Sequence, residues 1–282
     1  MVRRVSVAAV AIPAALGLVY LGGWPLALLL ALFGVVGAFE FYRMAEQGGL
    51  RPVRIAGFVG AAGMPLAALL TVSVWRPVDA GWLALGAAIW FVVTVSVTAL
   101  RRTPDDRPLS SVAVTVFGAL YAGALPAFLL PIRHAGAIDG ADAATALVFM
   151  PLVVTWVCDS LAMSAGSAIG GPKLARVLSP NKTWAGAIAG SMGAVLLAPL
   201  YGTFVLGRFD IEIALWQLAA FGLIISIVGQ IGDLSESLFK REVGAKDSGG
   251  FFPGHGGVLD RFDSLYWVLP SSALLLKLYG TI

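Results

Sequence analysis

Acidic and hydroxyl side chains recur with helical spacing at two places in the last third of this chain. Asp233, Glu236 and Ser237 stand at positions i, i+3 and i+4 of the segment GQIGDLSESLFKR, so they share one face of a helix. The segment DRFDS repeats the same order of acid, acid and hydroxyl. Its members are Asp260, Asp263 and Ser264. Two such sets predict one shared site.

The chemistry that suits these acids is binding of a hard divalent cation. A charged carboxylate near the centre of a bilayer costs about 2.5 to 3.5 kcal/mol on insertion scales, so several together need cations or water. Mg²⁺ takes oxygen ligands, keeps waters, and binds through one or two carboxylates plus substrate phosphates. We therefore expect Asp233, Asp260 and Asp263 to bind Mg²⁺, with the number of ions open. A lone His among carboxylates does not resemble a zinc site.

The alternative is that these acids form interfacial salt bridges with Lys240, Arg241 and Arg261. One set alone would not decide between the two readings. The repetition of the set, joined by a loop rich in glycine and cations, favours a functional site.

That joining loop reads KREVGAKDSGGFFPGHGGVLDR and is typical of an anion-binding segment. Glycines allow backbone amides to approach an anion closely, and the four cations would neutralise phosphate. His255 either donates a hydrogen bond to a phosphate or stabilises the turn. The expected substrate-binding residues here are Lys240, Arg241, Lys246, Asp247, His255, Gly256, Gly257 and Arg261.

A second polar segment, CDSLAMSAGSAIGGPKLARVLSPNKTWAG, contributes Asp159, Lys173 and Lys182. We expect both lysines to bind substrate, because an anion is stabilised at the start of the helix that follows. Thr183 or Asn181 is expected to cap that helix. Earlier in the chain, Glu40 is expected to pair with Arg43, three residues on.

Apolar helices must position these residues. Hydrophobic residues make up 59% of the chain and charged residues 12%, with a mean hydropathy of +0.88, which excludes an ordinary soluble domain. A bilayer core of about 30 Å needs about 20 apolar residues per helix. Nine stretches of that kind are expected at 5–21, 25–42, 55–75, 81–100, 111–132, 143–163, 183–206, 213–231 and 263–279.

Loop charge predicts the orientation. With alternating spans and a cytoplasmic N-terminus, fifteen of the nineteen Lys and Arg residues fall inside. This predicts a multi-pass protein of the inner or plasma membrane whose site faces the cytoplasm. The basic residues are divided among short loops, so we expect no nucleic-acid partner. The single cysteine, Cys158, excludes an internal disulfide or a cysteine metal cluster.

The pattern predicts one all-α membrane domain over residues 1–282. Residues 1–150 read as scaffold helices, because few polar side chains interrupt them. Residues 151–282 are expected to carry the chemistry.

The stretch from Ser237 to Asp263, SLFKREVGAKDSGGFFPGHGGVLDRFD, resembles the signature of phosphatidate cytidylyltransferases, also called CDP-diacylglycerol synthases. SPNKTWAG resembles the family's second motif, and Asp159 with Gly166 and Gly170 resembles the segment before it. The chain departs from the family at two positions. Ala185 stands where Glu is common, and Met163 where an aromatic residue is common.

The resemblance implies a polytopic helical fold, a homodimer, and Mg²⁺ with a monovalent cation such as K⁺ beside it. Asp233, Ser237, Asp260 and Asp263 match the family's metal and catalytic positions. The implied substrates are CTP and phosphatidate, and the products are CDP-diacylglycerol, the first committed precursor of anionic phospholipids, and pyrophosphate. The alternatives are a CTP-dependent polyprenol kinase, which would release CDP, and an ion-coupled transporter, whose sites usually lie near the bilayer midplane.

Overall fold

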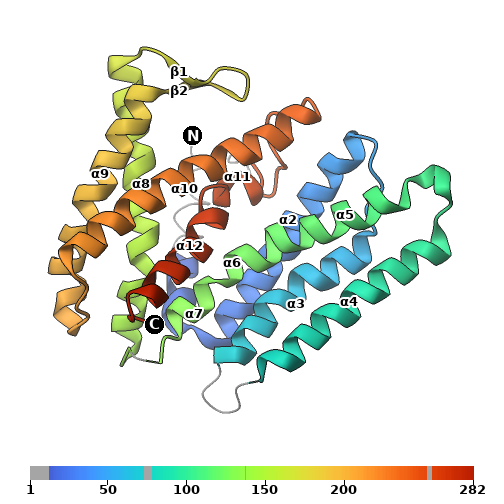
Figure 1. The fold of residues 1–282 in the computed structure, drawn as a ribbon, viewed down its shortest axis with the longest axis horizontal. Coiled ribbons are helices and arrows are strands. Elements are labelled where there is room, and N and C mark those ends of the chain that lie inside the picture. The colour runs from blue at the N-terminus through green and yellow to red at the C-terminus, as the bar shows by residue number, and fades with distance from the viewer. Residues whose placement is uncertain (1–12, 73–77, 137, 253–255) are drawn as a thin grey trace. The chain divides into compact units, whose positions relative to one another are not determined.

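The computed structural model describes residues 13–72, 78–136, 138–252 and 256–282 (Figure 1). The predicted span 5–21 lies only partly within these ranges, where residues 13–21 are helical. Gly254 and His255 lie outside the described residues, so their predicted roles stay predictions.

Within the described residues, seven helical segments are long and apolar enough to cross a membrane. They confirm an all-helical, polytopic architecture, and each matches one predicted span. The segments are α2 (Gly23–Gln47), α3 (Arg54–Val72), α4 (Ala80–Arg101), the run Pro104–Arg133, α8 (Ala141–Ile169), α9 (Trp184–Phe204) with the turn η3 (Leu206–Phe209), and α10 (Leu215–Glu242).

The run Pro104–Arg133 is irregular. It comprises η1 (Pro104–Asp106), α5 (Pro108–Ala119), the π-helical turn η2 (Leu120–Ala124), α6 (Leu125–Ala127) and α7 (Leu129–Arg133). Pro126 lies two residues after the π turn, and a proline has no backbone N–H to donate to the helix, so the hydrogen-bond pattern changes there.

The predicted ninth span is shorter than expected. The chain forms α11 (Leu259–Phe262), breaks at Asp263, and resumes as α12 (Leu265–Leu278). The Asp263 carboxylate accepts a hydrogen bond from the Ser264 amide at 2.7 Å, and the Ser264 carbonyl accepts the Val268 amide that opens α12. The 14 residues of α12 rise about 21 Å, less than a bilayer core of about 30 Å. A count of nine spans stays a prediction.

The all-α prediction missed one hairpin. Strands β1 (Lys173–Ala175) and β2 (Ser179–Thr183) pair antiparallel, and the described residues hold no other named strand. Figure 1 shows this hairpin beyond the adjoining ends of α8 and α9. The Thr183 hydroxyl accepts the Gly186 amide at 3.1 Å, which confirms Thr183 as the cap of α9. Asn181, the alternative candidate for this cap, lies in β2 instead.

The chain divides into two compact units, each discontinuous in sequence. The first unit comprises Met1–Pro131 and Glu242–Phe262, and the second comprises Ile132–Arg241 and Asp263–Ile282. The first unit therefore holds the glycine-rich loop together with the helices predicted as scaffold. The prediction of one domain over the whole chain stays a prediction.

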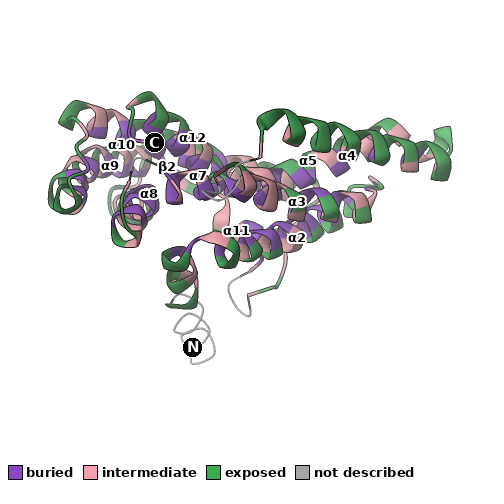
Figure 2. Cartoon of the chain, turned by 90° about the horizontal axis from the view of Figure 1, so that it is seen from below, coloured by how far each residue is buried: buried purple, intermediate pink, exposed green. Residues whose placement is uncertain are grey.

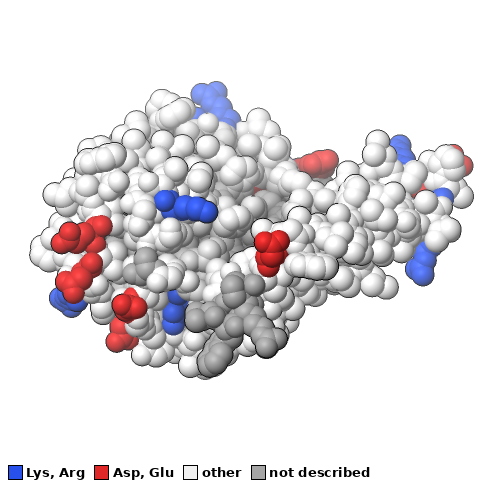
Figure 3. Space-filling view, turned by 60° about the horizontal axis from the view of Figure 1, so that its bottom comes forward, with Lys and Arg blue, Asp and Glu red and all other residues white. Residues whose placement is uncertain are grey.

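Much of the apolar surface is exposed, as lipid requires. Helix α4 is coloured almost entirely as exposed in Figure 2 although its composition is apolar, with Trp82 at 70% and Val92 at 60% exposure. On the face drawn in Figure 3, charged side chains are few and separated by wide uncharged areas. Such a surface is stable in a bilayer and unstable in water.

Candidate active site

A polar pocket of about 730 Å³ lies within the second unit. The end of α8, the hairpin, the first turn of α9, the middle of α10 and the residues before α12 all contribute to it. Four of the predicted site residues line this pocket, although they are spread over ninety positions of sequence. They are Lys173, Lys182, Asp233 and Asp263.

Glycines allow the close packing that forms one wall. Gly186 and Gly190 of α9 face the backbone of α8 at Ala162 and Cys158, and neither position has room for a side chain. Small residues at such contacts are the usual way for membrane helices to approach closely. The start of α9, with Lys182 just before it, is thereby held beside the end of α8, which carries Asp159.

Three carboxylates and two lysines line the pocket. Lys182 forms an ion pair with Asp233 (side chains 26% and 31% exposed), and the Ser237 hydroxyl lies 3.5 Å from Asp233 Oδ1. Asp159 and Asp263 both lie near enough to Asp233 for their negative charges to repel it. The pocket-lining groups therefore carry an excess of negative charge, which a bound cation would offset.

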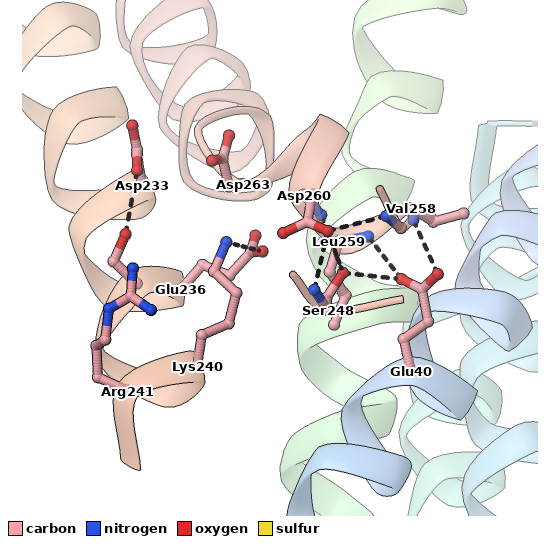
Figure 4. Close-up of polar contacts among 12 residues, drawn as sticks. Glu40, Asp233, Glu236, Lys240, Arg241, Ser248, Val258, Leu259, Asp260 and Asp263 are labelled. Carbon is pink, nitrogen blue, oxygen red and sulfur yellow. Dashed lines mark hydrogen bonds and ion pairs between the residues drawn. The ribbon is translucent and has the colours of Figure 1, made fainter. Parts of the chain in front are cut away.

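Two predicted phosphate ligands are engaged elsewhere in this unit. Lys240 Nζ lies 3.1 Å from the buried carboxylate of Glu236, as the salt-bridge alternative expected (Figure 4). Arg241 donates to the Leu178 carbonyl in the hairpin turn at 3.4 Å. The first contact lies within the last turns of α10, and the second joins the end of α10 to the hairpin.

In the first unit, the glycine-rich loop is anchored on Glu40 of α2. This carboxylate is only 3% exposed and accepts the amides of Val258 at 3.1 Å and Leu259 at 3.0 Å (Figure 4). The ion pairs among the described residues do not include one between Glu40 and Arg43, so that prediction is wrong. Burial explains the outcome, because a buried carboxylate needs several donors close by.

Asp260 organises the same loop. Its Oδ2 accepts the amides of Ser248 and Gly257, both at 2.9 Å, and lies 2.9 Å from the Ser248 hydroxyl. That hydroxyl is also 3.2 Å from Glu40, so its single proton can serve one carboxylate at a time. The loop amides of Ser248 and Gly257 thus bind a carboxylate of the protein itself.

The remaining predicted loop residues lie mostly at the surface. Lys246, Asp247 and Arg261 are exposed, and Gly256 adopts a φ of +84° that favours glycine. Asp260 belongs to the first unit, whereas Asp233 and Asp263 belong to the second. That all three share one site stays a prediction.

No group of three or more His, Cys, Asp or Glu side chains within the described ranges forms a ready-made metal centre. Mg²⁺ needs less than that, since one or two carboxylates with waters and substrate phosphates suffice. Asp233 and Asp263 in the polar pocket fit this requirement.

Sequence reasoning missed three residues that matter here. Gln230 lines the pocket and donates to Ser191 at 3.2 Å and to the Ala187 carbonyl at 3.4 Å. The sequence feature that could have identified Gln230 is a single amide side chain inside an apolar predicted span. Glu40 offered the comparable signal of a lone acid inside a span, and Ser248 offered none beyond its place in the loop.

Known proteins resemble this chain in sequence over most of its length. Residues 2–279 match the sequence model of the cytidylyltransferase family. A phosphatidate cytidylyltransferase of Bacillus subtilis (strain 168) is 31% identical over 280 residues, which cover 99% of each chain. One of Synechocystis sp. is 31% identical over 95% of this chain and 94% of its own. One of Brucella abortus is 48% identical over 138 residues, so this chain matches about half (47%) of its length.

Proposed function

The chain belongs to the cytidylyltransferase family, and on that premise we propose that it transfers the cytidylyl group of CTP to phosphatidate. The products are CDP-diacylglycerol and pyrophosphate. The observation that carries the proposal is the polar pocket of the second unit, where lysines and carboxylates face one another in an otherwise apolar protein.

An oxygen of the phosphatidate phosphate attacks the α-phosphorus of CTP. The bond from that phosphorus to the bridging oxygen breaks, and pyrophosphate leaves with the electron pair. The attacking oxygen is already anionic near neutral pH, so the reaction needs positioning and charge stabilisation more than a general base.

Each pocket residue has a role under this proposal. Lys173 and Lys182 hold phosphate oxygens, because both lie in the hairpin that borders the pocket. Ser237 orients the Asp233 carboxylate. Asp159 adds negative charge to the pocket wall and keeps Lys182 directed inward by attraction.

Mg²⁺ is the metal we propose, held by Asp233 and Asp263. When bound, it would neutralise the phosphate charge that Lys173 and Lys182 leave unneutralised. Asp260, the third predicted ligand, and an accompanying monovalent cation such as K⁺ stay predictions.

We further propose a homodimer in the cell membrane, with the N-terminus and both polar loops on the cytoplasmic side. The support for the orientation is the excess of Lys and Arg in those loops. Cys158 is the one cysteine of the chain and is buried. A Cys158→Ala protein with Lys246→Cys should therefore react with an impermeant thiol reagent only when the cytoplasmic side is open.

The experiment that tests the reaction is transfer of label from α-³²P-CTP to lipid by the purified protein with phosphatidate. Labelled lipid with equimolar pyrophosphate supports the proposal. Release of CDP from a polyprenol acceptor would instead identify the kinase alternative.

A further inference from the structure

An apolar groove of about 570 Å³ adjoins the polar pocket in the second unit. One face of α9 and one face of α10 form its walls, with residues at the i, i+4 and i+7 spacings of a helix face. The α9 wall is Trp184, Ile188, Met192 and Val195, and the α10 wall is Leu223, Ile227, Ile231 and Leu234.

The groove and the polar pocket are adjacent. Leu174, Ala187 and Gln230 line both of them. Gln230 bridges α10 to α9 at this junction through its bonds to Ser191 and the Ala187 carbonyl. A ligand lying across the junction would thus have a polar end among lysines and carboxylates and an apolar end among aliphatic side chains.

The two helices touch near one end of the groove. Gly222 of α10 lies against the backbone of α9 at Ala194, with no room for a side chain between the helices. The residues shared with the polar pocket, Ala187 and Gln230, lie toward the opposite end.

The dimensions suit one hydrocarbon chain. Trp184 and Leu196 both line the groove, and the helix between them rises about 18 Å. One leaflet of a bilayer core is about 15 Å thick. An extended acyl chain matches this length and the apolar lining of the groove.

We propose that this groove binds one acyl chain of phosphatidate while the phosphate of the same lipid lies in the polar pocket. The inference rests on the proposed function and adds the residues that position the lipid. Gln230 is a positioning residue in this account, because it fixes the separation of α9 and α10 where the headgroup meets the chain.

The test is the chain-length preference of Val195→Trp, which fills the end of the groove away from the junction. The control is Leu200→Trp, because Leu200 is 53% exposed on α9 and does not line the groove. With dioleoyl and dioctanoyl phosphatidate as the two substrates, Val195→Trp should lower the ratio of their kcat/KM values at least fivefold. Leu200→Trp should stay within twofold of the unmodified protein.

An unchanged ratio in Val195→Trp would overturn the inference, and so would a change of oligomeric mass in detergent without a change of ratio. A second measurement does not depend on that variant folding. Phosphatidate with a diazirine at the chain end should label peptides covering 188–196 or 223–234, and labelling confined to other helices would contradict the groove. Failure of the unmodified protein to use either lipid would refute the proposed function instead, and the photolabel would still decide the groove.

Discussion

The carboxylate of Glu40 in α2 accepts the backbone amide of Leu259 at 3.0 Å, across 219 positions of sequence. This hydrogen bond joins the first unit's long helix to the end of the glycine-rich loop. Its neighbours strengthen the link, since Val258 donates to the same carboxylate and Phe33 of α2 packs against Phe252 and Phe262. The loop of the family signature is thus held by a helix whose sequence carried no motif.

Glu40→Gln should loosen this loop. The amide side chain keeps one acceptor oxygen and places an NH₂ group where the second amide donates, so one charge-assisted hydrogen bond is lost. Such a bond contributes about 1.5 to 3 kcal/mol. Limited proteolysis should cut faster within 243–258. Glu46→Gln is the matched control, because Glu46 forms an exposed ion pair with Arg54 that contributes at most about 1 kcal/mol. Equal cleavage rates in the two variants would contradict the anchoring role.

Asp260→Asn should affect the loop as well as turnover. Sequence reasoning alone expects loss of activity in an intact protein. The three contacts to Asp260 Oδ2 predict in addition that the loop opens, because the uncharged amide oxygen of Asn accepts these hydrogen bonds more weakly than the carboxylate does. Proteolysis should therefore separate Asp260→Asn from Asp233→Asn, in which the loop stays resistant. If the loop resists proteolysis in both variants, Asp260 does not anchor the loop and acts only in the reaction.

Lys182→Met should raise the KM for CTP at least tenfold. The change removes a cation from the pocket and leaves Asp233 without its ion pair, so repulsion of the triphosphate grows. Arg176→Met is the control, because Arg176 is an exposed cation of the same hairpin turn that does not line the pocket. Steady-state kinetics at saturating phosphatidate distinguish the two. Similar KM values in both variants would rule out a phosphate contact by Lys182.

Gly186→Val should disrupt the packing of α9 against α8, which forms one wall of the pocket. A side chain at this position meets the Ala162 carbonyl of α8, and overpacking of this kind costs about 1 to 3 kcal/mol. The variant should lose thermal stability in detergent together with CTP binding. Gly63→Ala, where nothing lies within 4 Å, should lose neither. A stable Gly186→Val protein would contradict the close α8–α9 packing.

The sequence predicted what depends on local spacing. Apolar length located seven helices, and the i, i+4 spacing placed Ser237 beside Asp233. Contacts between residues far apart in the chain could not be predicted from the sequence, because residue spacing carries no information on which helices become neighbours. The Glu40 anchor and the groove between α9 and α10 are of that kind. The predicted span 263–279 begins within two residues of α12, but hydropathy does not register the bond from the Ser264 amide to the Asp263 side chain at that point.

If Asp233 holds Mg²⁺ for cytidylyl transfer, three proteins will differ in labelled CDP-lipid formation over a Mg²⁺ titration. The unmodified chain and Asp142→Asn, an exposed acid in the first turn of α8, should make labelled lipid and pyrophosphate with the same Mg²⁺ dependence and stop in excess EDTA. Asp233→Asn should lose at least a hundredfold in turnover at every Mg²⁺ concentration while remaining folded. Normal turnover by Asp233→Asn, or undiminished transfer in EDTA, would contradict the account.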